Sequence, residues 1–144
     1  MPTRTAKAHW EGDLFKGKGS VDLRSSGVGT YDVSWPSRTE EPNGQTSPEE
    51  LIAAAHASCF SMAFSNQLTQ AGGTVEALDT TADVTVEKTD SGFAITGIQL
   101  TTRGRVSGID AAAFESAAQA AKAGCPVSKA LAGTTITLDA ALES

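Results

Sequence analysis

Two cysteines are the residues of this chain best suited to redox chemistry. Cys59 and Cys125 are the only cysteines among its 144 residues. A thiolate is a nucleophile and a metal ligand, whereas a thiol in apolar surroundings is inert. The local environment of each cysteine therefore decides between catalysis and ordinary packing.

Cys59 falls inside a long helix that the sequence predicts from Ser47 to about Gln70. Ser47 is a good N-cap, Pro48 suits the first helical position, and Glu50 completes a capping-box pattern. Cys59 lies about three turns further on, where the helix dipole has little effect. From these residues alone, a buried cysteine acting as a small hydrophobic side chain is as good an interpretation as a catalytic thiol.

Cys125 has a different setting, because it directly precedes Pro126 at the start of a short predicted helix. Free backbone N–H groups at a helix N-terminus favour a thiolate. The alternative is a small residue packed into a tight Gly124-Cys-Pro turn. The residues themselves thus make Cys125 the more easily ionised of the two thiols.

Two further side chains on the long helix bear on the chemistry of Cys59. His56 shares its helix face, one turn earlier, and could activate the thiol or bind a metal, although such a histidine is more often a hydrogen-bonded core residue. A zinc site from His56, Cys59 and Cys125 lacks a recognisable ligand spacing. Glu49 precedes Cys59 by a helical rise of about 15 Å, beyond the reach of its side chain. A site that contains both Glu49 and Cys59 therefore requires two copies of the helix. The alternative is that Glu49 takes no part in the site and only stabilises the helix dipole.

Composition restricts the partners and the compartment. The net charge of −6 and the sequence pI of about 4.8 disfavour nucleic acid as a partner. The most apolar stretch, residues 51–64, is shorter and more polar than the ~20 apolar residues that span a membrane. The first ten residues lack the apolar core of a signal peptide. We therefore expect a cytoplasmic protein with reduced thiols, no membrane and a single domain over residues 1–144.

Hydrophobic periodicity predicts an α+β fold. Alternating apolar residues predict an antiparallel meander that includes Trp35, and the long helix is apolar on most sides, which is typical of a central buried helix. A phase slip at Gly97 indicates a β-bulge. The expected elements are strands within 5–36, the helix of 47–70, strands within 75–106, a helix from Asp110, a short helix from Pro126 and a strand at 136–142.

Two motifs carry a resemblance to a known family. The segment SPEELIAAAHASCFSMAFS at 47–65, followed by CPVSKAL at 125–131, resembles the OsmC/Ohr family, that is, the osmotically inducible protein C and organic hydroperoxide resistance proteins. The resemblance extends over nearly the whole chain in element order, and the OsmC branch is the more similar. It implies antiparallel sheets wrapped around a long central cysteine helix in an intertwined homodimer. It also implies a cysteine-based peroxidase without haem, flavin, metal or other cofactor.

The resemblance assigns roles that the residues alone do not. It makes Cys59 the peroxidatic cysteine and Cys125 the resolving cysteine. Glu49 corresponds to the acidic partner of an activating arginine, and Arg38, expected in the loop before the helix, corresponds to that arginine. Nothing in the sequence itself distinguishes Arg38 from the other arginines.

The expected reaction is reduction of organic hydroperoxides, and more weakly of hydrogen peroxide, to alcohols. A Cys59 sulfenic acid would condense with Cys125, and an external thiol, such as a lipoylated or other dithiol, would reduce the disulfide. Phe60, Met62 and Phe64 favour an organic substrate, although each is also an ordinary core residue. The alternatives are a non-enzymatic small-ligand-binding module and a redox sensor or sulfur carrier with the same fold.

Overall fold

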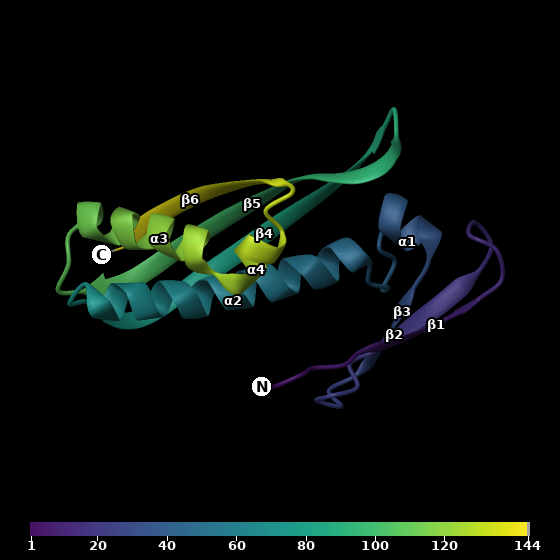
Figure 1. The fold of residues 1–144 in the computed structure, drawn as a ribbon, viewed down its shortest axis with the longest axis horizontal. Helices are drawn as coiled ribbons and strands as arrows, with labels where there is room; N and C mark the ends of the chain where they lie inside the picture. Colours follow the sequence, from purple (N-terminus) through teal and green to yellow (C-terminus); the bar gives the residue numbers. More distant parts are fainter. Residues whose placement is uncertain (144) are drawn as a thin grey trace. The chain divides into compact units, whose positions relative to one another are not determined.

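The computed structural model describes residues 1–143, shown as a ribbon in Figure 1. The chain forms two compact units, one ending at Leu51 and the other beginning at Ile52. We call them the first and the second unit. The boundary falls within a long helix, and a single domain over 1–144 remains a prediction.

The first unit contains a three-stranded antiparallel sheet, which confirms the predicted meander, and a short helix that the sequence did not predict. Trp35 is an exception, because it begins the short helix instead of continuing the last strand. Ser34 caps this helix by accepting a hydrogen bond from the Ser37 backbone N–H, which ends the extended conformation. The elements are β1 (Lys7–Glu11), β2 (Lys18–Asp22), β3 (Thr30–Val33) and α1 (Trp35–Thr39).

The long helix α2 (Pro48–Gln70) agrees with its predicted bounds. The Ser47 hydroxyl accepts a hydrogen bond from the backbone N–H of Glu50 at 3.2 Å, which confirms the N-cap. The helix is not buried on most sides, however. Its fully buried residues recur every fourth position, whereas Met62 on another face is 72 % exposed. The fully buried residues are His56, Phe60, Phe64 and Leu68.

The second unit contains a three-stranded sheet in the order β4-β5-β6. The strands β4 (Thr74–Thr89) and β5 (Gly92–Ser107) form a long antiparallel hairpin with a register shift beside Gly97, so the predicted bulge is confirmed. The last strand, β6 (Thr135–Glu143), runs parallel to β5. The α+β class is thus confirmed, but the expectation of antiparallel sheets holds only in part, because this sheet is mixed.

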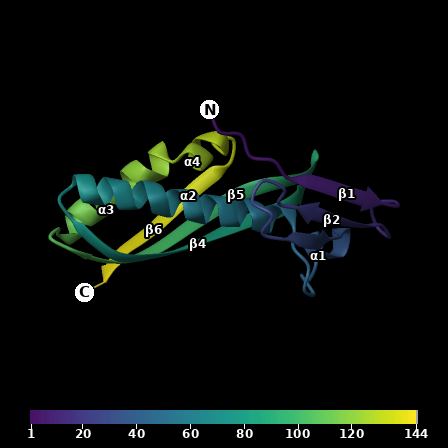
Figure 2. The same cartoon turned by 90° about the horizontal axis from the view of Figure 1, so that it is seen from below.

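Two more helices connect β5 with β6: α3 (Ala111–Gly124) and α4 (Pro126–Ala130). Asp110 caps α3 with a hydrogen bond from the Ala113 backbone N–H at 2.8 Å, as the sequence predicted. α2 and α3 lie side by side on one face of the β4-β5-β6 sheet, seen from a second direction in Figure 2.

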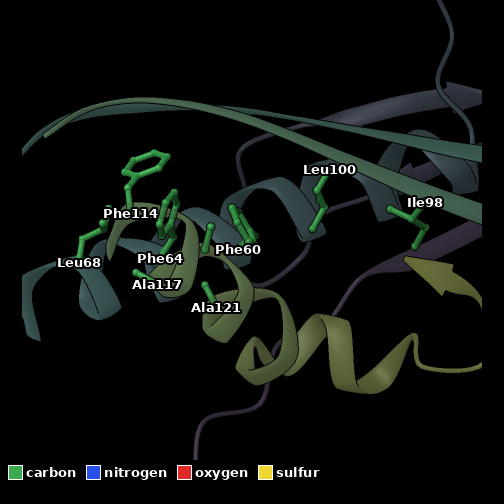
Figure 3. Packing of buried hydrophobic residues seen from close by; sticks show 9 residues of the cluster. Phe60, Phe64, Leu68, Ile98, Leu100, Phe114, Ala117 and Ala121 are labelled. Carbon is green, nitrogen blue, oxygen red and sulfur yellow. The ribbon is translucent and has the colours of Figure 1, made fainter. Parts of the chain in front are cut away.

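Aromatic packing between α2 and α3 forms the centre of this core (Figure 3). The Phe64 ring lies 5.4 Å from the Phe60 ring and 4.9 Å from the Phe114 ring, both between centroids. Ile98 and Leu100 of β5 complete the layer. Because the core fixes α2 against α3, it also fixes the cysteine on α2 relative to the end of α3.

Among residues 1–143, no helix combines the length and the apolar character needed to cross a lipid bilayer.

Candidate active site

The two cysteines meet within the second unit. Their sulfur atoms lie 2.9 Å apart, and both are free thiols. A disulfide requires an S–S distance of about 2.05 Å, so a small movement would join them. Residues far apart in the sequence thus form a pair suited to reversible dithiol–disulfide chemistry.

The two cysteines are brought together by helix α2, which carries Cys59, and by the junction between α3 and α4, which carries Cys125. Cys59 projects from α2 next to the buried Phe60. Cys125 ends α3, where its N–H donates to the Ala121 carbonyl at 2.9 Å. It also begins α4, where its carbonyl accepts from the Lys129 N–H at 3.0 Å. Cys59 is half-buried, whereas Cys125 is completely buried, so only Cys59 offers a route for a reagent from solvent.

The two thiols differ in acidity. Burial raises the pKa of Cys59, and its hydrogen bond with Cys125 raises that pKa further. Burial also raises the pKa of Cys125, but hydrogen bonds from Cys59, from Ser128 and from the Val127 backbone outweigh it, so the pKa of Cys125 is lowered. The predicted preference for a Cys125 thiolate therefore agrees with its surroundings.

A buried histidine lies behind the cysteine pair. His56 is completely buried, and its Nε2 lies 2.7 Å from the Ser128 hydroxyl. Burial lowers the pKa of His56, so the imidazole is neutral near pH 7. Its Nδ1 has no hydrogen-bond partner among residues 1–143. The histidine thus makes its polar contact on one side only, through Nε2.

Arg38 and Glu49 form an ion pair within the first unit. The Arg38 Nε donates to both carboxylate oxygens at 3.0 and 3.1 Å, and Nη2 donates to Oε2 at 2.9 Å. The Glu49 side chain is 7 % exposed and that of Arg38 is 34 % exposed. Such a multidentate pair orients a guanidinium well. Arg38 lies on α1, not in the loop where the sequence analysis expected it.

The guanidinium borders an apolar pocket of about 370 Å³ in the first unit. The Arg38 Cζ lies 5.9 Å from the centroid of the Trp35 ring, within the range of a cation–π contact. Trp10 and Leu14 add apolar surface to the same pocket. The arrangement places a fixed positive charge next to a surface that suits an organic molecule.

The predicted site residues therefore form two pairs. Cys59 and Cys125 meet in the second unit, and Arg38 and Glu49 meet in the first. Glu49 and Cys59 are both on α2, ten positions apart, which is a rise of about 15 Å. Within residues 1–143, no three side chains of the His, Cys, Asp and Glu types gather as a metal site would require.

The family model for OsmC-like proteins matches residues 41–139, which include both cysteines. Peroxiredoxin OsmC of Escherichia coli K12 is 50 % identical over 141 residues, covering 98 % of this chain and 97 % of the relative. The chain belongs to the OsmC family. The predicted family and its OsmC branch are thus confirmed.

Solved structures of this family have the same fold. An organic hydroperoxide resistance protein OsmC from Legionella pneumophila aligns with a TM-score of 0.76 at 26 % identity, covering 100 % of this chain and 98 % of that one. OhrB of Bacillus subtilis, an organic hydroperoxide resistance protein, aligns with a TM-score of 0.72 at 26 % identity, covering 96 % and 98 %. The OsmC-like fold extends over nearly the whole chain.

Sequence reasoning missed Ser128. The residue is three positions after Cys125, and this spacing brings a side chain at the start of a helix back toward the cap residue. The C-P-V-S segment therefore contained the signal. The contact between Ser128 and His56 joins residues 72 positions apart, and no local pattern reveals it.

Proposed function

We propose that this OsmC-family protein is a thiol-dependent peroxidase that reduces organic hydroperoxides to alcohols. The observation that carries the proposal is the 2.9 Å separation of the Cys59 and Cys125 sulfurs. The names of its relatives, a peroxiredoxin and two organic hydroperoxide resistance proteins, support the same chemistry. Hydrogen peroxide is expected to be a poorer substrate, because it gains nothing from an apolar pocket.

The cycle needs two sulfur atoms and an external reductant. The Cys59 thiolate attacks the O–O bond, takes one oxygen as a sulfenic acid, and releases an alkoxide that is protonated to the alcohol. The Cys125 sulfur then attacks the Cys59 sulfur, so that a disulfide forms and water leaves. A dithiol reductant, lipoylated or of another kind, restores both thiols and is itself oxidised.

Accessibility supports Cys59 as the cysteine that reacts first. The lowered pKa of Cys125 favours a thiolate there, but its sulfur is completely buried. Cys59 has the higher pKa and the more open position. A hydroperoxide can reach Cys59 only, so access, not resting acidity, determines the order of the two cysteines. Cys59 then requires a cation that stabilises its thiolate in the reaction.

Arg38 is our candidate for that cation, with Glu49 holding it in place. Its guanidinium can stabilise the thiolate and orient the peroxide oxygens. Because Glu49 and Cys59 are separated by about 15 Å along one helix, we infer that the arginine comes from the second copy in a homodimer.

We further infer that the reaction takes place in the cytoplasm. Both cysteines are free, and a reducing compartment keeps such a pair available for repeated oxidation. The partners are then a hydroperoxide, a dithiol donor and a second copy of the chain, without nucleic acid, membrane, metal or cofactor.

Mass spectrometry after rapid mixing tests this function. One equivalent of cumene hydroperoxide is added to the reduced protein, and free thiols and intact mass are followed within seconds. We expect loss of both thiols, a mass lower by two hydrogens and no bond between chains. Two unreacted thiols in folded protein would instead favour a small-ligand-binding module. Oxidation without sustained turnover in the presence of a dithiol would favour a redox sensor.

A further inference from the structure

The short helix α4 has Cys125 as its N-cap residue, so the position of this helix decides where the second sulfur lies. The helix comprises only five residues. A helix of this length is unstable by itself, because its first turn fixes more dihedral angles than its hydrogen bonds compensate. The position of α4, seen after α3 in Figure 1, therefore depends on contacts with the rest of the second unit.

Ser128 is the buried residue of α4. Its exposure is 5 %, whereas Pro126, Lys129 and Ala130 are exposed and Val127 is only partly buried. A helix usually packs by burying an apolar side chain. Here the side chain that is turned inward is a hydroxyl, and a buried hydroxyl costs free energy unless it is hydrogen-bonded. The partner of Ser128 therefore has a large influence on where α4 can lie.

His56 of α2 is that partner. Its Nε2 lies 2.7 Å from the Ser128 hydroxyl, and the imidazole is completely buried. Its Nδ1 has no hydrogen-bond partner among residues 1–143, which costs free energy. An apolar side chain would fill this place without an unpaired nitrogen. What the histidine adds is a directional contact between α2 and α4.

The imidazole contact and the sulfur contact join the same two segments. On α2, His56 precedes Cys59 by three positions, which is about one helical turn. On the other side, Ser128 follows Cys125 by the same number of positions. The two contacts measure 2.7 and 2.9 Å. Two contacts one turn apart fix both the distance and the rotation of α4 relative to α2, which a single contact cannot do.

Another contact holds the opposite end of this segment. Leu131, directly after α4, packs partly against the aromatic core. This contact restrains the end of the helix that is remote from Cys125. The hydrogen bond between His56 and Ser128 is the contact that restrains α4 one turn from the sulfur.

We propose that His56 and Ser128 are positioning residues that hold α4 against α2 and keep the Cys125 sulfur within reach of Cys59. We call this pair the His56–Ser128 clamp. Because a disulfide needs an S–S distance of about 2.05 Å, a small movement suffices, and the clamp remains closed in both redox states. It orders α4 in advance and so raises the effective concentration of one sulfur at the other. Its consequences for the peroxide cycle rest on the proposed function.

The clamp bears on what happens to an oxidised Cys59. The sulfenic acid can condense with the Cys125 thiol: the S–S bond forms, the S–O bond breaks, and the leaving hydroxide takes the thiol proton as water. It can instead react with a second hydroperoxide, which transfers one oxygen to the sulfur and leaves as the alcohol. The resulting sulfinic acid is not restored by thiols. Rapid condensation therefore protects Cys59 from irreversible oxidation.

An equilibrium with glutathione tests the clamp without peroxide. The protein is incubated at known ratios of reduced to oxidised glutathione and quenched with acid, and intact mass gives the fraction with the Cys59–Cys125 disulfide. Ser128→Ala and His56→Leu should each lower the equilibrium constant of this disulfide about tenfold, since one hydrogen bond is lost. His56→Gln keeps a polar nitrogen near the place of Nε2 and should restore most of it. The double variant Ser128→Ala/His56→Leu should lose no more than either single variant.

Thr102→Val is a matched control. Thr102 is completely buried in the same unit, and its hydroxyl hydrogen-bonds with Thr80 at 3.0 Å, away from α4. This variant also loses a buried hydroxyl, but it should keep the wild-type equilibrium constant. A wild-type constant in Ser128→Ala would overturn the clamp, and so would an equal decrease in Thr102→Val.

Rapid quenching with excess cumene hydroperoxide tests the consequence for the cycle. Intact mass reports the sulfenic acid as a gain of one oxygen, the disulfide as a loss of two hydrogens and the sulfinic acid as a gain of two oxygens. In Ser128→Ala, we expect the first oxidation to keep its rate, disulfide formation to slow about tenfold and sulfinic acid to increase. Disulfide formation at the wild-type rate would overturn this role of the clamp. If the wild type ignores the hydroperoxide while the glutathione constants differ as expected, the clamp stands and the proposed function fails.

Discussion

The first and the second unit each contain one of the two side-chain pairs that the proposed peroxidase cycle uses. The second unit holds two sulfurs 2.9 Å apart, largely shielded from solvent. The first holds a guanidinium fixed by three hydrogen bonds to Glu49, with a third of the arginine side chain exposed. In the proposed cycle, the second unit supplies the nucleophile and the first supplies the activating cation.

This difference shows how stability and reactivity are distributed. The cysteine pair is held by the aromatic core between α2 and α3, where any disturbance is costly. The arginine pair depends on its own ionic hydrogen bonds and borders an open apolar pocket. We therefore expect changes in the second unit to decide whether the chemistry occurs, and changes in the first to decide how fast it begins.

The largest effect should come from replacing the sulfurs. Cys59→Ser should reduce hydroperoxide turnover about 10³-fold or more, because the attacking atom is lost. Cys125→Ser should still consume one equivalent of cumene hydroperoxide and then stop, leaving a sulfenic acid that a dimedone-type reagent can trap. Peroxide consumption is measured by single-turnover assay. A Cys125→Ser protein that fails this single turnover while Cys59→Ser retains it would reverse the order of the cysteines.

The next largest effect should come from replacing Arg38 in the first unit. Arg38→Ala should slow Cys59 oxidation about 10²-fold, the usual loss when one charge-stabilising donor is removed, and should shift the oxidation profile to higher pH. Arg38→Lys should recover part of the rate, since it keeps the charge but loses the paired hydrogen bonds. Stopped-flow oxidation measured across a pH range provides the test.

Arg24→Ala is the control for Arg38. Arg24 belongs to the same unit and pairs with Asp22 at 3.1 Å, but the Arg24 side chain is 53 % exposed and that of Asp22 is 35 % exposed, whereas Glu49 is 7 % exposed. Exposed pairs of this kind contribute little, so oxidation should remain unchanged. Equal oxidation profiles for Arg38→Ala and the wild type would exclude Arg38 as the activating group.

The same contrast explains what the sequence revealed. Local patterns predicted the Ser47 cap, the Asp110 cap and the bulge at Gly97, because each depends on neighbouring residues. Periodicity did not reveal that β6 runs parallel to β5, since strand direction depends on the connection through α3 and α4. The burial of α2 was overestimated because apolar composition does not specify which face is covered.

The candidate site was predictable only where a motif carried it. Cys125 could be placed at a helix N-terminus from its Pro126 neighbour, and the structure agrees. Arg38 came from family resemblance alone, because its partner Glu49 lies beyond a loop that no periodicity describes. The contact of His56 with Ser128 depends on how α4 returns to α2, which only the folded chain determines.

The smallest predicted effect concerns stability and belongs to the second unit alone. Burial lowers the pKa of His56 below its ordinary 6.5, so the unfolded chain binds a proton at a higher pH than the folded chain. The contribution of His56 to the free energy of unfolding should therefore be fully present above pH 6.5. It should decrease as the pH drops below 6.5, until the folded-state pKa of His56 is reached. The slope contributed by His56 cannot exceed about 1.4 kcal/mol per pH unit.

Urea unfolding from about pH 5 to 8 should show that His56→Gln lacks this part of the decline, whereas His9→Gln, at an exposed position of the first unit, retains it. Equal declines in the wild type and His56→Gln would mean that the pKa of His56 does not change on folding, contrary to the effect expected of its burial.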